Sequence, residues 1–101
     1  MTTMDNKLYK VLVVEDNPGD FFIVEDLLSE YILKPVITNA VNFKEAVALV
    51  SAADNIFDVI LLDISLPDKS GQALVTEMLQ AAPLCPIIIL TGYTDVDFSI
   101  K

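Results

Sequence analysis

The sequence contains no histidine and no tryptophan, a single cysteine (Cys85), and only six basic residues against fifteen acidic ones. With one cysteine an internal disulfide cannot form, and the chain is expected to be intracellular, where thiols stay reduced. The formal net charge of −9 argues against nucleic acid or an anionic membrane surface as a partner, because both require a basic face.

Long hydrophobic runs are also missing. The polar segment 1–7 is followed by only a brief apolar run, whereas a membrane span needs roughly 20 apolar residues and a signal peptide also needs a longer apolar core. We therefore expect a soluble, cytoplasmic protein with no membrane partner. The length of 101 residues and the 53% hydrophobic content predict one globular domain over residues 1–101.

Four short apolar runs rich in valine, isoleucine and leucine are present. They are Tyr9–Val14, Val36–Thr38, Ile56–Leu62 and Ile87–Leu90. Because these runs are continuous and do not alternate with polar residues, they predict strands covered on both faces, as in a parallel sheet with helices on each side.

The stretches between these runs have helical spacing. Apolar faces are predicted from Phe21, Val24, Leu28 and Tyr31, from Phe43, Ala46 or Val47, and Val50, and from Leu74, Val75, Met78 and Leu79. Asn17 and Pro18 are typical of a helix start, and Asn42 with Glu45 forms a capping pair. A further helix is predicted from Thr94. The alternation of strand and helix predicts an α/β fold with a doubly wound parallel sheet.

The residues at the carboxyl ends of these strands are candidates for chemistry, since ligands of open parallel sheets bind there. The first strand is followed by Glu15 and Asp16, the third ends in Asp63, and the fourth is followed by Thr91. Clustered carboxylates suit Mg²⁺, and one of them could act as a nucleophile toward a phosphoryl group, with a threonine hydroxyl bonding a phosphoryl oxygen.

Each of these residues also has an ordinary structural interpretation. Asp16 precedes Asn17–Pro18 and could simply serve a turn, while Asp63 and Thr91 could be polar ends of strands. The functional interpretation depends on their combination at one edge of the sheet.

Three segments resemble the receiver domain of bacterial two-component response regulators. They are Val11-Leu-Val-Val-Glu-Asp16, Asp63-Ile-Ser-Leu-Pro67-Asp-Lys-Ser-Gly71 and Pro86-Ile-Ile-Ile-Leu-Thr-Gly92. The resemblance spans nearly the whole chain and implies a flavodoxin-like receiver fold with strand order 2-1-3-4. The implied function is a phosphorylatable signalling switch, phosphorylated by a histidine kinase, a phosphotransfer protein or a small phosphodonor, with a fused or separate output domain.

The resemblance also implies roles for individual residues. Asp63 is the expected phosphoacceptor and a Mg²⁺ ligand, Asp16 a direct Mg²⁺ ligand, and Glu15 a ligand acting through water. The main-chain carbonyl of Ser65 is a further expected metal ligand, and Thr91 is the switch hydroxyl. Pro67 and Gly71 are expected to shape the loop after Asp63, and the side chains of Ser65 and Tyr93 to affect the lifetime of the phosphorylated state.

One departure concerns the C-terminus. Similar receivers continue into a fifth strand that ends in a phosphate-binding lysine, and Lys101 is not its equivalent. Without that strand the fourth strand has an unpaired edge, which favours pairing between chains. We expect a sequence shortened at its C-terminus; one part of a longer natural protein and an exchanged homodimer are the alternatives.

Other classes of protein remain as alternatives. A receiver-like interaction domain with a silent or impaired site fits the departure at the C-terminus. A multiple-turnover phosphohydrolase with an aspartate nucleophile is disfavoured, because Ser65 stands where a second acid is expected after Asp63. A flavodoxin-like cofactor binder is rejected, since Glu15 and Asp16 place repelling charge at the expected phosphate loop.

Overall fold

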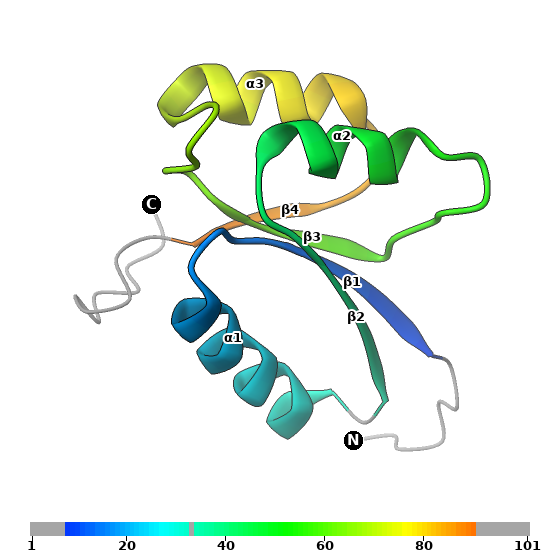
Figure 1. Cartoon of the computed structure of the whole chain (residues 1–101). Coiled ribbons are helices and arrows are strands. Elements are labelled where there is room, and N and C mark those ends of the chain that lie inside the picture. The colour runs from blue at the N-terminus through cyan, green and yellow to red at the C-terminus, as the bar shows by residue number, and fades with distance from the viewer. Residues whose placement is uncertain (1–7, 33, 91–101) are drawn as a thin grey trace.

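The computed structural model describes residues 8–32 and 34–90, which form strands and helices in alternation (Figure 1). These elements are β1 (Tyr9–Val14), α1 (Pro18–Tyr31), β2 (Pro35–Ala40), α2 (Phe43–Ser51), β3 (Val59–Asp63), α3 (Gly71–Ala81) and β4 (Ile87–Leu90). All strand pairs are parallel and the order is β2-β1-β3-β4, which confirms the predicted α/β fold and strand order. None of the described helices is long and apolar enough to cross a membrane.

Strand β1 lies inside the sheet, and residues 11–14 are fully buried because helices cover both of its faces. Leu12 and Val14 point to the face covered by α2 and α3, and contribute to a core that contains Leu74 and Met78. Val11 and Val13 point to the opposite face, which α1 covers. Figure 1 shows α1 on one side of the sheet and α2 with α3 on the other, which is the doubly wound arrangement.

The predicted helix starts are confirmed, with one difference in detail. The Asn17 side chain accepts hydrogen bonds from the main-chain N–H groups of Gly19 and Asp20 at 2.8 and 3.1 Å, and Pro18 begins α1. The Asn42 side chain accepts from the N–H of Glu45 at 2.7 Å. In return Glu45 accepts from Val41 at 3.0 Å, one residue earlier than a reciprocal capping pair requires.

Two predicted positions on helix faces are wrong. Tyr31 is 81% exposed and Leu79 is 49% exposed. Ile32, four residues after Leu28, packs against the α1 side of the core in place of Tyr31. In α2 the core position left open between Ala46 and Val47 belongs to Ala46, which is fully buried.

The third strand is shorter than predicted. It begins at Val59, and Ile56, which was expected to open the strand, is 73% exposed. Asp58 explains this start, since its carboxylate accepts a hydrogen bond from the N–H of Lys10 at 2.8 Å and its own N–H donates to the carbonyl of Lys10 at 2.7 Å. The helix predicted from Thr94 lies outside the described residues.

Candidate functional site

Three carboxylates gather at the carboxyl edge of the sheet. Glu15 and Asp16 follow β1, and Asp63 ends β3, the neighbouring strand. One carboxylate oxygen from each residue lies within 4.8 Å of the other two. Glu15 is 1% exposed, Asp63 is partly buried and Asp16 is exposed, so the cluster runs from the interior to the surface. The structure thus brings together three of the predicted site residues.

Glu15 is held by hydrogen bonds on its main chain and its side chain. Its N–H donates to the carbonyl of Ala40 at 2.9 Å, which extends the pairing of β1 and β2 by one residue. Its Oε2 accepts from the N–H of Asn17 at 3.1 Å. The main-chain oxygen of Glu15 accepts from the side-chain amide of Asn39 at 3.2 Å. The buried carboxylate therefore has a defined position at the inner end of the cluster.

Asp63 directly precedes the loop between β3 and α3, residues 64–70. Its Oδ1 accepts a hydrogen bond from the N–H of Ser65 at 3.0 Å, which turns the chain directly after the strand. Leu66 anchors this loop in the core, where it is nearly fully buried. At the end of the loop, the N–H of Gly71 donates to the carbonyl of Ile64 at 2.8 Å. Gly71 has a φ of +66°, a left-handed conformation that favours glycine, which fits its expected role in shaping the loop.

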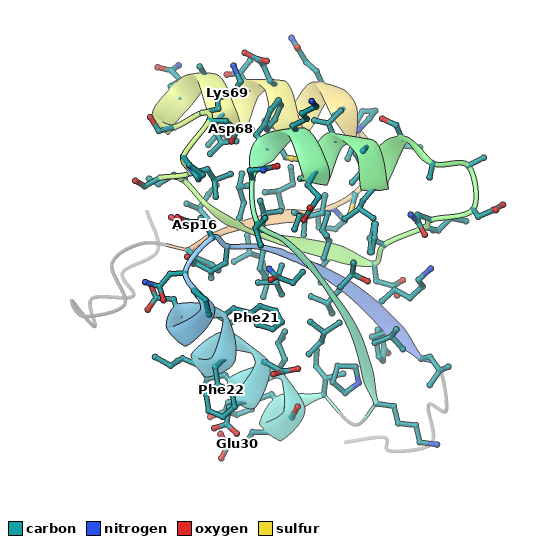
Figure 2. All side chains as sticks on the ribbon, in the orientation of Figure 1. Asp16, Phe21, Phe22, Glu30, Asp68 and Lys69 are labelled. Atoms are coloured by element: carbon teal, nitrogen blue, oxygen red, sulfur yellow. The ribbon has the colours of Figure 1, made fainter. Side chains whose placement is uncertain are left out.

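Asp68 is a structurally important residue of this loop that the sequence analysis missed. Its two carboxylate oxygens accept hydrogen bonds from the N–H groups of Phe43 and Lys44 at the start of α2, at 2.9 and 3.0 Å. These bonds, the one from Phe43 above all, keep the pKa of the Asp68 carboxyl below its usual value. Figure 2 labels Asp68 and the neighbouring Lys69 beside α2 and α3. An aspartate after a proline signals a turn, but it does not reveal a bond to a helix 25 positions earlier.

Thr91 and Tyr93, which were also expected near the site, lie outside the described residues, as does Lys101. The expected switch role of Thr91 therefore stays a prediction. Ser65 lies on the acidic edge through its bond to Asp63. Its expected role as a main-chain metal ligand also stays a prediction.

The donor chemistry of the cluster fits a hard divalent cation. All three side chains offer oxygen atoms, which Mg²⁺ prefers over nitrogen or sulfur. Three carboxylates this close repel one another, and the inner one, Glu15, is almost completely removed from solvent. A cation among them would offset both the repulsion and the cost of burying that charge.

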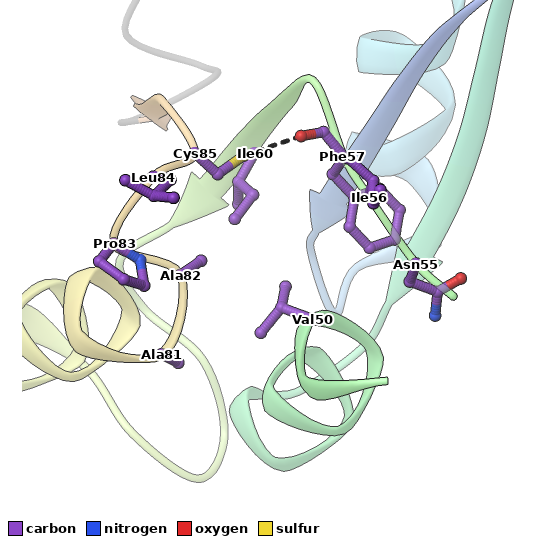
Figure 3. A pocket seen from close by; sticks show the side chains of 10 residues that line it. All are labelled: Val50, Asn55, Ile56, Phe57, Ile60, Ala81, Ala82, Pro83, Leu84 and Cys85. Atoms are coloured by element: carbon purple, nitrogen blue, oxygen red, sulfur yellow. Dashed lines mark hydrogen bonds between the residues drawn. The ribbon is translucent and has the colours of Figure 1, made fainter. Parts of the chain in front are cut away.

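A pocket of about 280 Å³ lies at the opposite edge of the sheet, between the ends of α2 and α3 and the starts of β3 and β4 (Figure 3). Its lining is mostly apolar. Cys85 is its one nucleophile, with Sγ 3.3 Å from the carbonyl oxygen of Phe57. Burial, and then the charge of Asp58, raise the pKa of this thiol, which disfavours the nucleophilic thiolate form. The chemistry of the described residues is therefore concentrated at the acidic edge.

A four-stranded parallel α/β sheet with an acidic cluster of Glu15, Asp16 and Asp63 at its carboxyl edge fits the active site of a receiver domain. Residues 11–101 match the family model described as the response regulator receiver domain. The chain belongs to this family.

Individual relatives agree with this assignment. The chain is 36% identical to the response regulator protein PilR of Pseudomonas aeruginosa over 91% of its own length and 20% of PilR. It is similar to the MaeR response regulator bound to beryllium trifluoride, with a TM-score of 0.72 and 26% identity over 83% of this chain and 67% of that one.

A third relative is a response regulator from Burkholderia pseudomallei with a phosphorylated aspartic acid, a calcium ion and citrate. Its TM-score is 0.68, with 28% identity over 84% of this chain and 48% of that one. The chain thus spans about a fifth of PilR and about half of the Burkholderia protein.

Proposed function

We propose that this chain is a phosphorylatable switch of a two-component phosphorelay, in which Asp63 accepts a phosphoryl group in a Mg²⁺-dependent reaction. The observation that carries the proposal is the convergence of Glu15, Asp16 and Asp63 within 4.8 Å at one edge of the sheet. The reported phosphorylated aspartic acid in the Burkholderia relative supports the same chemistry. The donor is a histidine kinase, a phosphotransfer protein or a small phosphodonor, and the setting is the cytoplasm.

The proposed reaction is an in-line displacement at phosphorus. Oδ1 of Asp63 is engaged by the N–H of Ser65, so Oδ2 is the oxygen that attacks. A new bond forms between Oδ2 and phosphorus, the bond from phosphorus to the donor atom breaks, and the leaving group takes that electron pair. The product is an acyl phosphate on Asp63. The Thr91 hydroxyl then donates a hydrogen bond to the transferred group.

The proposed metal ligands are the carboxylates of Asp16 and Asp63, the main-chain carbonyl of Ser65, and Glu15 acting through water. A Mg²⁺ held by these groups would supply positive charge to offset the charge that develops on the phosphoryl oxygens. The bond from Asn17 to the carboxylate of Glu15 keeps the inner acid in place.

The surface beside the cluster supports a protein as phosphodonor. Helix α1 begins two residues after Asp16 and exposes apolar side chains, among them Phe22, which is 67% exposed. In Figure 2, Phe21 points toward the sheet and Phe22 points away from it. A donor protein docked on this helix would bring its phosphoryl group close to Asp63 while burying Phe22.

The test is the intact mass after incubation with Mg²⁺ and acetyl phosphate, for the wild type and for Asp63→Asn. A gain of one phosphoryl group by the wild type alone, lost when Mg²⁺ is chelated, is the expected result. Asp20→Asn is the matched control, because Asp20 is an acid in the first turn of α1 that is not part of the cluster, and its main-chain N–H donates to the cap residue Asn17.

No gain in any variant would contradict the proposal. The alternative, a receiver-like interaction domain with a silent or impaired site, would then be the better description. Continued release of inorganic phosphate over many turnovers, abolished by Asp63→Asn, would instead indicate a phosphohydrolase.

A further inference from the structure

The N-terminus of α2 is capped by two segments that are distant in sequence. The first free N–H groups of a helix have no partner within the helix and must find one elsewhere. Those of Phe43 and Lys44 donate to the carboxylate of Asp68. That of Glu45 donates to the side chain of Asn42. Two of the three free N–H groups in the first turn of α2 are therefore capped by the loop that follows Asp63.

Lys69, the next residue of the loop, also contacts the start of α2 and, in addition, α3. Its Nζ lies 5.4 Å from the centre of the Phe43 ring and 3.0 Å from Oε2 of Glu77 in α3. Within the loop, the N–H of Leu66 donates to the carbonyl of Lys69 at 3.2 Å. The loop is thus tied to α2 and α3 on one side and to Asp63 on the other.

We propose that Asp68 is a positioning residue for the acidic site, acting through the main chain of the loop. The inference rests on the proposed function, since Ser65, three residues before Asp68, offers its carbonyl to the metal there. That carbonyl shares a peptide plane with the N–H of Leu66, which donates to the carbonyl of Lys69, the residue after Asp68, at 3.2 Å. The two bonds from the start of α2 to the Asp68 carboxylate hold this part of the loop in place before any ligand binds.

The bonds of Asp68 are expected to raise the affinity for a cation because they order the loop before the cation binds. If the loop were free, the binding of a cation would have to order it, and the cost would be subtracted from the affinity. Partners that orient metal ligands from outside the coordination sphere commonly change affinity by about 10- to 100-fold. Asp68 acts on one main-chain ligand among several, so we expect a change of about 10-fold.

The experiment compares Asp68→Ala with the wild type and with Asp54→Ala. Asp54 is an exposed acid beyond the other end of α2, so the control removes the same charge and leaves the loop intact. Mg²⁺ is titrated while the main-chain amide signals of Asp16 and Asp63 are followed by NMR. The initial rate of phosphorylation by acetyl phosphate is measured over the same Mg²⁺ range.

For Asp68→Ala we expect the Mg²⁺ dissociation constant to rise about 10-fold, and the phosphorylation rate to return to the wild-type value at saturating Mg²⁺. Asp68→Asn should recover most of the affinity, because its amide oxygen still accepts a hydrogen bond from the helix end. Asp54→Ala should behave like the wild type.

An unchanged Mg²⁺ affinity in folded Asp68→Ala overturns the inference and leaves Asp68 a helix cap only. If the alanine variant does not fold, Asp68→Leu replaces it; leucine has no acceptor for either bond from the helix end, so an unchanged Mg²⁺ affinity there overturns the inference as well. A wild type that binds no Mg²⁺ also overturns the inference. A wild type that binds Mg²⁺ in an Asp68-dependent manner without being phosphorylated supports it while contradicting the proposed function.

Discussion

The side-chain amide of Asn39 in β2 donates to the main-chain oxygen of Val13 in the neighbouring strand β1 at 2.9 Å, and to that of Glu15, directly after β1, at 3.2 Å. It also reaches the carbonyl of Ala40 at 3.2 Å. The Asn39 side chain thus links β2 to the last residues of β1 and to Glu15, the first residue of the acidic cluster.

Replacing Asn39 with alanine is expected to lower the free energy of unfolding by about 1–3 kcal/mol, because carbonyls at the end of β1 lose a donor in a partly buried place. Urea denaturation followed by circular dichroism measures the change. Asn55→Ala is the matched control, since Asn55 makes a single such bond, to Leu49, at the opposite end of the domain. Equal stability of Asn39→Ala and wild type would contradict the bridging role.

Gly71→Ala is expected to destabilise the protein through backbone strain alone. The φ of Gly71 is +66°, and no heavy atom lies within 4 Å of the position that an added Cβ would take. The left-handed conformation costs a non-glycine residue about 1–2 kcal/mol, and Gly71→Asn should cost less because asparagine tolerates it better. Thermal unfolding of both variants provides the comparison. If Gly71→Asn were less stable than Gly71→Ala, the loss of stability would follow the size of the side chain and not the backbone conformation.

Leu74→Ala and Leu79→Ala separate the buried and exposed sides of α3. Leu74 is fully buried against the sheet, so its truncation should cost about 2–5 kcal/mol. Leu79 is half exposed, and the same change there should cost about 0.5 kcal/mol or less. Chemical denaturation of the two variants decides the matter, and similar losses would mean that α3 is rotated relative to the described packing.

The cap provided by Asp68 should depend on pH. The pKa of this carboxyl is lowered in the folded protein from its ordinary value of 3.8, first by the bond from Phe43. A lowered pKa means that the stabilisation is complete above the unfolded value and disappears as the pH falls through the folded value. The difference in unfolding free energy between wild type and Asp68→Asn should therefore be constant near neutral pH and shrink below 3.8. A difference that grows on acidification would contradict the assignment.

Much of the site could be predicted because topology alone brings its residues together. Carboxyl ends of parallel strands lie at one edge of a sheet, and the strand order implied by the resemblance places β3 beside β1, so acids that follow β1 and end β3 were expected to be neighbours. The apolar runs identified the strands because strands buried on both faces need continuous hydrophobic segments.

The errors have equally physical causes. Tyr31 fits a helical period as well as Ile32 does, and periodicity does not tell where the last turn of a helix meets the core. Ile56 is apolar enough to extend β3, but the first contact of this segment with β1 is the pairing of Asp58 with Lys10, and β3 begins directly after it, at Val59. Asp68 was missed because its partners depend on the path of a loop, which no local pattern encodes.

The inner position of β1 also has a consequence for motion. Its residues 11–14 are fully buried and paired on both sides, so their amide hydrogens should be among the last to exchange with deuterated water, opening only when the whole domain unfolds. Glu15 directly follows this strand, and Asp63 ends β3, which is also paired on both sides. Both acids therefore stand on inner strands, and the amide hydrogens of loop 64–70 are expected to exchange earlier than those of either strand.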